Sequence, residues 1–211
     1  MTNLRLCLIF ALVPAAAAAA AADPILSNLP GNVRTSVTTS LGLGVDGNHR
    51  SKAVGLTMGA QSLDFVSMVV HLGNGDDFAN SVFGGIYGDD GGNPGALLAA
   101  FDSASVSAGA VAEQFTLTIS DGFTLQAGVS YWFLLDGPDV LNNLYWPDLI
   151  PATPPTAFGD VTYDGYRFSA DNMNNWVNSS IFNTVQINAV PAPAGAAVFA
   201  LAAFAAARRR R

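Results

Sequence analysis

Short runs of apolar or alternating side chains, separated by clusters of Gly, Asp, Asn and Pro, occupy the middle of this chain. Within the runs, apolar side chains tend to recur at every second position, as they do in β-strands, and no run has the spacing of an amphipathic helix. Segments such as 88–95 and 136–139 have the composition of turns. The pattern therefore predicts an all-β domain, a β-sandwich of the jelly-roll type. The predicted strands are residues 25–29, 33–45, 52–58, 63–72, 81–87, 96–101, 114–119, 129–135, 163–169 and 184–187.

The run 63–72 differs from the others because both of its faces are mostly apolar. Phe65 and Val69 share one face, and Met68 and Val70 share the other. Such a strand is expected in the middle of the sandwich, with both faces covered or nearly so. Residues 147–155, with four prolines, are expected to form a long irregular surface loop.

The N-terminal segment, residues 1–22, has the features of a secretory signal peptide. Arg5 precedes an apolar run at 6–13, and an alanine tract then ends before Asp23. The sequence therefore predicts Sec-type export, with a signal peptidase cut before Asp23. The single cysteine, Cys7, lies in the segment to be removed, so the mature body is expected to fold without a disulfide.

The C-terminal segment, residues 190–211, has the features of a short membrane anchor with a stop. Between 194 and 207 the side chains are only those of Gly, Ala, Val, Phe and Leu. A helix of that length spans about 21 Å, against a hydrocarbon core of about 30 Å, so snorkelling and local thinning must assist it. The arginines that close the chain are expected to stay cytoplasmic and to leave the body outside. This membrane stop consists of Arg208, Arg209, Arg210 and Arg211.

The same 22 residues resemble the PEP-CTERM sorting signal, in which a Val-Pro-Glu-Pro motif precedes an apolar helix and an arginine cluster. The motif residues here are Val190, Pro191, Ala192, Pro193 and Ala194. Ala192 stands where the family has glutamate. The resemblance implies processing by an exosortase-like membrane protease, with a cut near Pro193, and a surface or extracellular location. An ordinary anchor that is never cut is the alternative.

The body also resembles the choice-of-anchor β domains, which are exported bacterial domains of unassigned activity. The resemblance implies location and architecture and supplies no catalytic residue. It lies in segments 25–29, 59–63, 86–87, 93–95 and 125–132.

Residues 23–189 have the length of one domain and a strongly acidic balance. They hold 16 acidic residues and four basic ones, Arg34, Arg50, Lys52 and Arg167, so their net charge is 4 − 16 = −12. That charge repels a phosphate backbone, and no nucleic-acid partner is expected.

Few residues suit catalysis. The only histidines are His49, expected in an exposed turn, and His71, at the end of an apolar strand, and no Gly-x-Ser-x-Gly elbow is present. The sole glutamate, Glu113, lies at a strand entry. We therefore expect no catalytic residue, with a secreted hydrolase as the weaker alternative.

Aspartates in the Gly- and Asn-rich loops are candidate calcium ligands, because Ca²⁺ prefers carboxylate and amide oxygens. The adjacent pairs are Asp76 with Asp77 and Asp89 with Asp90, and Asn93 lies close to the second pair. The same residues are typical of turns, and a turn role is the favoured interpretation. We therefore expect no required cofactor, with a bound calcium ion as the alternative.

Exposed aromatic residues beside polar ones are candidate sugar-binding groups. Trp146 follows Tyr145 before the proline-rich segment, and Trp176 follows an asparagine-rich one. The alternative is that these tryptophans cap the ends of the sandwich, and Trp132 is expected in the core. The sequence thus predicts an exported, non-catalytic β-sandwich, with an exopolysaccharide-binding module as the alternative.

Overall fold

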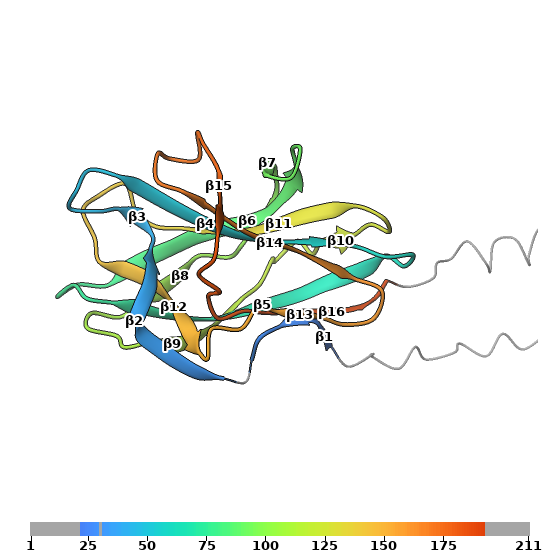
Figure 1. Ribbon diagram of the computed structural model, residues 1–211, viewed down its shortest axis with the longest axis horizontal. Helices are drawn as coiled ribbons and strands as arrows, with labels where there is room; N and C mark the ends of the chain where they lie inside the picture. The colour runs from blue at the N-terminus through green and yellow to red at the C-terminus, as the bar shows by residue number, and fades with distance from the viewer. Residues whose placement is uncertain (1–21, 30, 193–211) are drawn as a thin grey trace, which may run out of the picture.

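A computed structural model describes residues 22–29 and 31–192, and all regular structure in this part of the chain is β-strand (Figure 1). No helix that could cross a membrane is found among these residues. The predicted signal peptide before residue 22, the apolar helix 194–207 and the stop at 208–211 lie outside them. The strands form two antiparallel sheets that face each other, as the prediction of a β-sandwich requires.

The first sheet has the order β13-β1-β16-β5-β12-β2, and β9 and β10 also pair with β5. Its strands are β1 (Asp23–Ser27), β2 (Asn32–Ser40), β5 (Leu63–Asn74), β9 (Glu113–Leu117), β10 (Thr124–Leu125), β12 (Leu144–Ile150), β13 (Thr156–Ala157) and β16 (Gln186–Pro191).

The second sheet has the order β15-β14-β4-β11-β6-β7, with β3 paired to β4 and β8 paired to β6. Its strands are β3 (Gly42–Leu43), β4 (His49–Thr57), β6 (Asn80–Asp89), β7 (Pro94–Ala100), β8 (Ala104–Val106), β11 (Ser130–Asp136), β14 (Thr162–Ser169) and β15 (Val177–Ser179).

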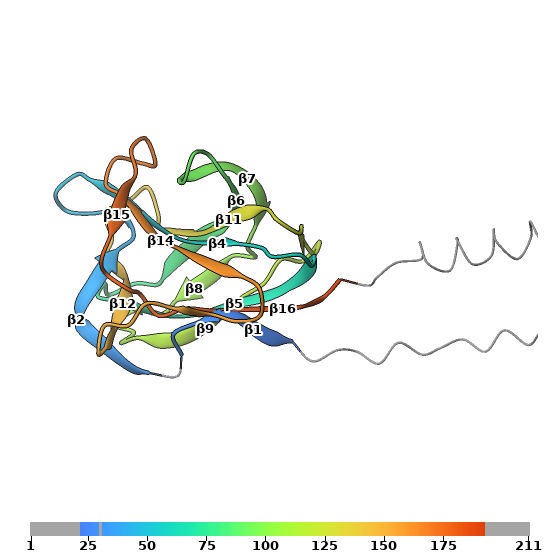
Figure 2. The same cartoon turned by 45° about the vertical axis from the view of Figure 1, so that its right-hand side comes forward.

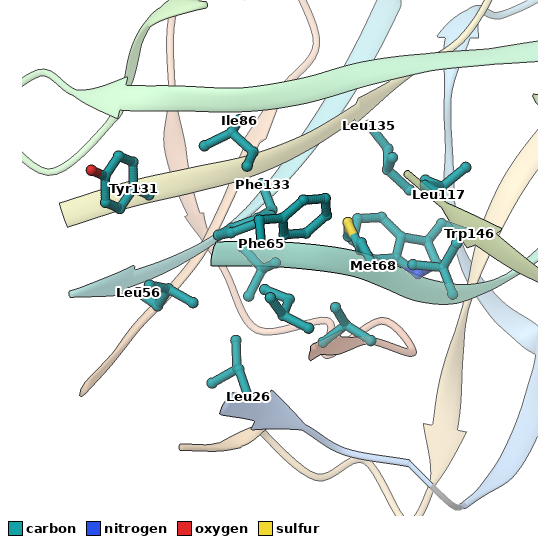
Figure 3. Close-up of a cluster of buried hydrophobic side chains, with 14 of the residues drawn as sticks. Leu26, Leu56, Phe65, Met68, Ile86, Leu117, Tyr131, Phe133, Leu135 and Trp146 are labelled. Carbon is teal, nitrogen blue, oxygen red and sulfur yellow. The ribbon is translucent and has the colours of Figure 1, made fainter. Parts of the chain in front are cut away.

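Strand β11 shows how alternation builds the core. Tyr131, Phe133 and Leu135 point between the sheets, where Phe133 packs against Phe65 of β5 with ring centroids 5.8 Å apart (Figure 3). Trp132 and its neighbour Leu134 belong to a smaller apolar cluster on the outer side of the second sheet. Each fully buried large side chain contributes about 1.5 to 3 kcal/mol, so the inter-sheet cluster supplies most of the hydrophobic stabilisation.

A β-bulge in β5 explains why the sequence shows two apolar faces there. Asn188 of β16 pairs with Ser67, but the next residue, Ala189, pairs with Phe65, so Val66 is left over. The extra residue reverses the alternation. Phe65 and the later Met68 therefore both point inward, while Val66 is 38% exposed. The expected central position of this strand is confirmed, because β5 lies between β16 and β12 in its sheet. The expected covering of both faces is wrong, because the bulge turns apolar residues from both sequence faces toward the core.

The expected surface loop at 147–155 is also partly wrong, because Pro147 lies inside strand β12. Pro147 pairs with Thr38 of β2, and the register shifts immediately afterwards, before Asp148. A bulge is one of the few places where a sheet tolerates a residue without an amide hydrogen. Residues 147–149 are buried, and irregular chain is confined to the segment between β12 and β13.

The two ends of the described chain lie side by side. β1 and β16 are antiparallel neighbours, with Asp23 opposite Ala189 and Ser27 opposite Gln186. Both strands reach the same end of the sandwich (Figure 2). The chain therefore enters and leaves the domain at the same end, through two neighbouring strands of one sheet.

Candidate functional site

The start of the C-terminal motif is part of the fold. Val190 and Pro191 end strand β16, opposite Asp64 and Leu63 of β5, and the amide of Ala192 donates to the carbonyl of Ser62 at 3.2 Å. Val190 and Pro191 are therefore extended. The boundary expected between residues 189 and 190 falls inside a strand, and the sheet holds the chain as far as Ala192. Pro193 and Ala194 lie outside the described residues.

Trp146, a predicted sugar-binding residue, is fully buried, and this prediction is wrong. Its side chain has 0% exposure and lies among the labelled core side chains in Figure 3. The indole Nε1 donates to the carbonyl of Thr184 at 2.7 Å, and the ring meets Tyr166 edge-on with centroids 6.0 Å apart. The pairing of β12 with both β5 and β2 places Trp146 between the sheets, where no ligand reaches it.

Tyr145 and Trp176 are half-buried and belong to different sheets. Tyr145, on β12, lies across Gly73, where a Cβ would approach its ring to 2.1 Å, and its hydroxyl lies 3.5 Å from the carbonyl of Ala110. Trp176 lies in the connection between β14 and β15, against the outer cluster of the second sheet. The three predicted aromatic residues are therefore not brought together.

That outer cluster is organised around Trp132, which is 1% exposed, so its expected burial is confirmed. It lies on the outer side of its sheet, however, and not between the sheets. Its Nε1 donates to Asp89 at 2.8 Å, and the guanidinium of Arg167 lies 5.0 Å from the ring centroid. Arg167 also donates to the carbonyl of Gly92 at 2.8 Å, which fixes the loop beyond β6 over the indole. A cation held over a buried indole stabilises this face.

The carboxylates of the candidate calcium ligands Asp76 and Asp89 accept hydrogen bonds within turns. Asp76 accepts hydrogen bonds from the amide and the side chain of Asn143, at 2.8 and 2.6 Å, and from Asn80 at 2.6 Å. Asp89 accepts from the amide of Gly92 and from Trp132. These contacts are those expected of turn residues.

Their neighbours lie in the same turns: Asp77 precedes β6, and Asp90 exchanges backbone hydrogen bonds with Asn93. Among the described residues no group of three acidic, histidine or cysteine side chains converges on a metal position. Calcium binding stays a prediction.

His49 is held between two carboxylates and contacts no serine within the described structure. Its Nε2 lies 2.8 Å from Asp136, and its Nδ1 lies 3.2 Å from Asp139. Both nitrogens donate only in the imidazolium form. The exposed turn expected for His49 is wrong, because its side chain is only 10% exposed. These contacts hold the segment after β11 against the start of β4, and they differ from the serine–histidine pair of a hydrolase.

His71 is half-buried on β5. Burial lowers its pKa below the usual value, and its Nδ1 has no partner in the described structure. Within the described residues, neither histidine thus forms the serine contact of a Ser–His catalytic pair.

The sequence indicates no role for Lys52, but the structure places this charged residue in the interior of the domain. It is 0% exposed, on the inner face of β4, and its Nζ donates to Ser179 Oγ at 2.6 Å, to the carbonyl of Ile181 at 2.9 Å and to Thr39 Oγ1 at 3.4 Å. Burial lowers the pKa of Lys52 to about 7, against the opposing effect of Asp148. The alternation Lys52, Val54, Leu56 in the sequence could have indicated this inward position.

Lys52 lines a crevice where β2 of the first sheet meets β4, β14 and β15 of the second. The crevice has a volume of about 200 Å³. Its lining residues are Thr38, Thr39, Ser40, Arg50, Lys52, Phe168, Ser179 and Ile181. Hydroxyl groups and two cations meet apolar side chains here, which is the composition of a small-molecule site.

No protein family, curated protein or solved structure matches this chain.

Proposed function

We propose that this chain is an exported bacterial surface or extracellular-matrix protein, sorted and cut through its C-terminal signal at 190–211. The body lies outside the cytoplasm, and its sandwich, of the jelly-roll type, has no catalytic role. Its partners are the Sec-type export machinery, a signal peptidase, the membrane and an exosortase-like protease. The proposal rests on residues 1–22, the motif at 190–194 and the arginines at 208–211.

The observation that carries the proposal is the pairing of β1 with β16. Asp23, the expected first residue of the mature chain, lies opposite Ala189, close to the start of the sorting motif. All strands of the described structure lie between residues 23 and 191. Both expected cuts therefore fall outside the paired segments, and neither removes a strand of the sandwich.

A cut near Pro193 also agrees with the contacts of β16. Pairing with β5 extends to Pro191, and the amide of Ala192 still bonds to Ser62 just before β5, so a protease has no free extended backbone before Ala192. Pro193, which lacks an amide hydrogen, suits a break between this strand and a following helix. The body released by such a cut keeps every residue of β16.

Two sets of variants in the native host test the proposal. Replacing Arg208 to Arg211 with serine removes the stop, so we expect membrane retention before processing to be lost. Replacing Pro191 and Pro193 with alanine is expected to block the cut and to leave membrane insertion intact. Pro154→Ala, in the exposed segment after β12, is the matched control. Processing of the double variant at the normal rate would contradict the proposal.

Polysaccharide binding is the second candidate, and one observation favours it. Trp176 is half-buried against the outer cluster, so part of its ring remains available for stacking on a sugar. A glycan array probed with the exported protein and with its Trp176→Ala variant tests this role. Equal signals from both proteins would rule out Trp176 as the contact.

A further inference from the structure

We propose that the crevice beside Lys52 is a binding site for a small organic carboxylate about the size of one uronic acid residue. This site is independent of the sorting signal, and it goes beyond the function proposed above. It is built from β2, β4, β14 and the end of β15, far in sequence from residues 190–211.

The first argument is the charge of Lys52. Its ammonium group is removed from water, and its three hydrogen-bond partners are two neutral hydroxyls and one carbonyl. The face of Tyr166 lies 5.1 Å from Nζ. These hydrogen bonds of Nζ all go to neutral groups, and Asp148 is the acidic residue whose charge acts on Lys52. A buried cation solvated in this way favours an anion in the adjoining space.

The second argument is the direction of the hydroxyl donors. Ser179 Oγ accepts from Lys52 and also, at 3.3 Å, from the amide of Ile181. Its own hydrogen therefore points away from both donors. Thr39 is different, because its hydroxyl already donates to Asn183 at 3.2 Å. Ser179 lines the crevice, and because a hydroxyl that accepts twice keeps one hydrogen to donate, it can donate that hydrogen to a ligand there.

The rim supplies further donors. The hydroxyls of Thr38 and Ser40 line the crevice, and Arg50 lies beside them. The Arg50 guanidinium is paired with Asp46, which offsets part of its charge. These groups donate hydrogen bonds and present no carboxylate, so they suit carboxylate oxygens and sugar hydroxyls.

Size and polarity narrow the ligand class. The volume of about 200 Å³ is smaller than the roughly 300 to 1,000 Å³ of sites for drug-sized ligands. Phe168 and Ile181 give the lining of the crevice an apolar part beside its hydroxyls. An inorganic anion leaves that apolar part without a contact, whereas a sugar acid covers it with its carbon face. A carboxylate on a single ring therefore fits better than sulfate.

Titration calorimetry of the exported protein, purified from its host, tests the site with glucuronate, glucose and sulfate. At pH 6, where Lys52 is charged, we expect glucuronate to bind one to one and glucose to bind at least about tenfold more weakly, the ratio for a charge-assisted hydrogen bond. Sulfate is expected to be similarly weaker than glucuronate. Equal binding of glucose or sulfate would overturn the assignment.

Paired serine variants locate the site. Ser179→Ala removes this donor and is expected to weaken glucuronate binding by about tenfold. Ser180→Ala changes the exposed neighbour and is expected to have no effect. Equal affinities for the two variants would show that glucuronate binds elsewhere.

The charge of Lys52 is tested by Lys52→Met, which is expected to abolish the preference for glucuronate over glucose. If that variant does not fold, the pH dependence decides. Affinity of the unaltered protein should fall as Lys52 loses its proton above pH 7, with Asp148, Tyr166 and Arg50 as the neighbouring ionisable groups. Affinity that is constant between pH 6 and pH 9 would overturn the role of Lys52.

Discussion

Replacement of Trp146 tests the arrangement of the core most sharply. The side chain is fully buried, so Trp146→Ala removes a large apolar group and leaves a cavity, at a cost of about 3 to 5 kcal/mol. It also leaves the carbonyl of Thr184 without its indole donor, which adds about 1 kcal/mol. Trp146→Phe keeps most of the ring but loses that hydrogen bond, so we expect a cost of about 1 to 2 kcal/mol.

Urea denaturation followed by far-ultraviolet circular dichroism measures these differences, because the signal does not depend on the replaced indole. The purified protein is compared with Trp146→Ala, Trp146→Phe and Trp176→Ala. Trp176 is half-exposed, so its truncation should cost only about 1 kcal/mol. A cost for Trp146→Ala no larger than that for Trp176→Ala would refute the buried position of Trp146. If the alanine variant does not fold, the phenylalanine variant gives the comparison.

Three further predictions follow from other contacts. A body that ends at Ala189 lacks the last hydrogen bonds of β16, so urea denaturation should show it to be about 1 to 2 kcal/mol less stable than a body that ends at Ala192. Equal stabilities of the two bodies would contradict the pairing. Burial lowers the pKa of Lys52 from 10.5 to about 7, so above pH 7 the unfolded chain binds more protons than the folded protein does. The free energy of unfolding should therefore rise by about 2 kcal/mol between pH 7 and pH 9, relative to the Lys52→Met variant. Gly55→Ala would place a Cβ 2.6 Å from the fixed ring of Trp132, so it should lower the free energy of unfolding by about 1 to 3 kcal/mol. Gly88→Ala is the control: its Cβ would meet no atom closer than 3.8 Å, so the stability should change little.

The strands were largely predictable because their side-chain alternation is a local property. Each of the ten predicted runs overlaps a strand, and Asp136 and Asp89 end strands close to the expected turns. Short strands such as β8 and β13 were missed, since two or three residues carry too little alternation to be recognised. Strand β12 was missed because Pro147 was read as the start of a loop, and only the partner strands show that a bulge accommodates it.

The candidate site was less predictable, because it depends on which residues of distant strands face each other. Trp146 and Trp176 look alike in sequence, with asparagines nearby, yet one is enclosed between two sheets and the other lies on an outer face. Lys52 is one of four cations in a body of net charge −12, and a surface position is the usual expectation for lysine. Its partners Ser179 and Ile181 lie about 130 residues away in the chain, beyond the reach of any local pattern.

The central claim, sorting through a cleaved C-terminal signal, is tested most directly by the intact mass of the surface-associated protein from its native host. The account predicts a chain that begins at or near Asp23 and ends close to Pro193, no earlier than Ala192, because β16 is paired up to that point. Such a mass lacks Arg208 to Arg211. A mature protein that still ends at Arg211 would contradict the account and indicate an ordinary anchor that is never cut.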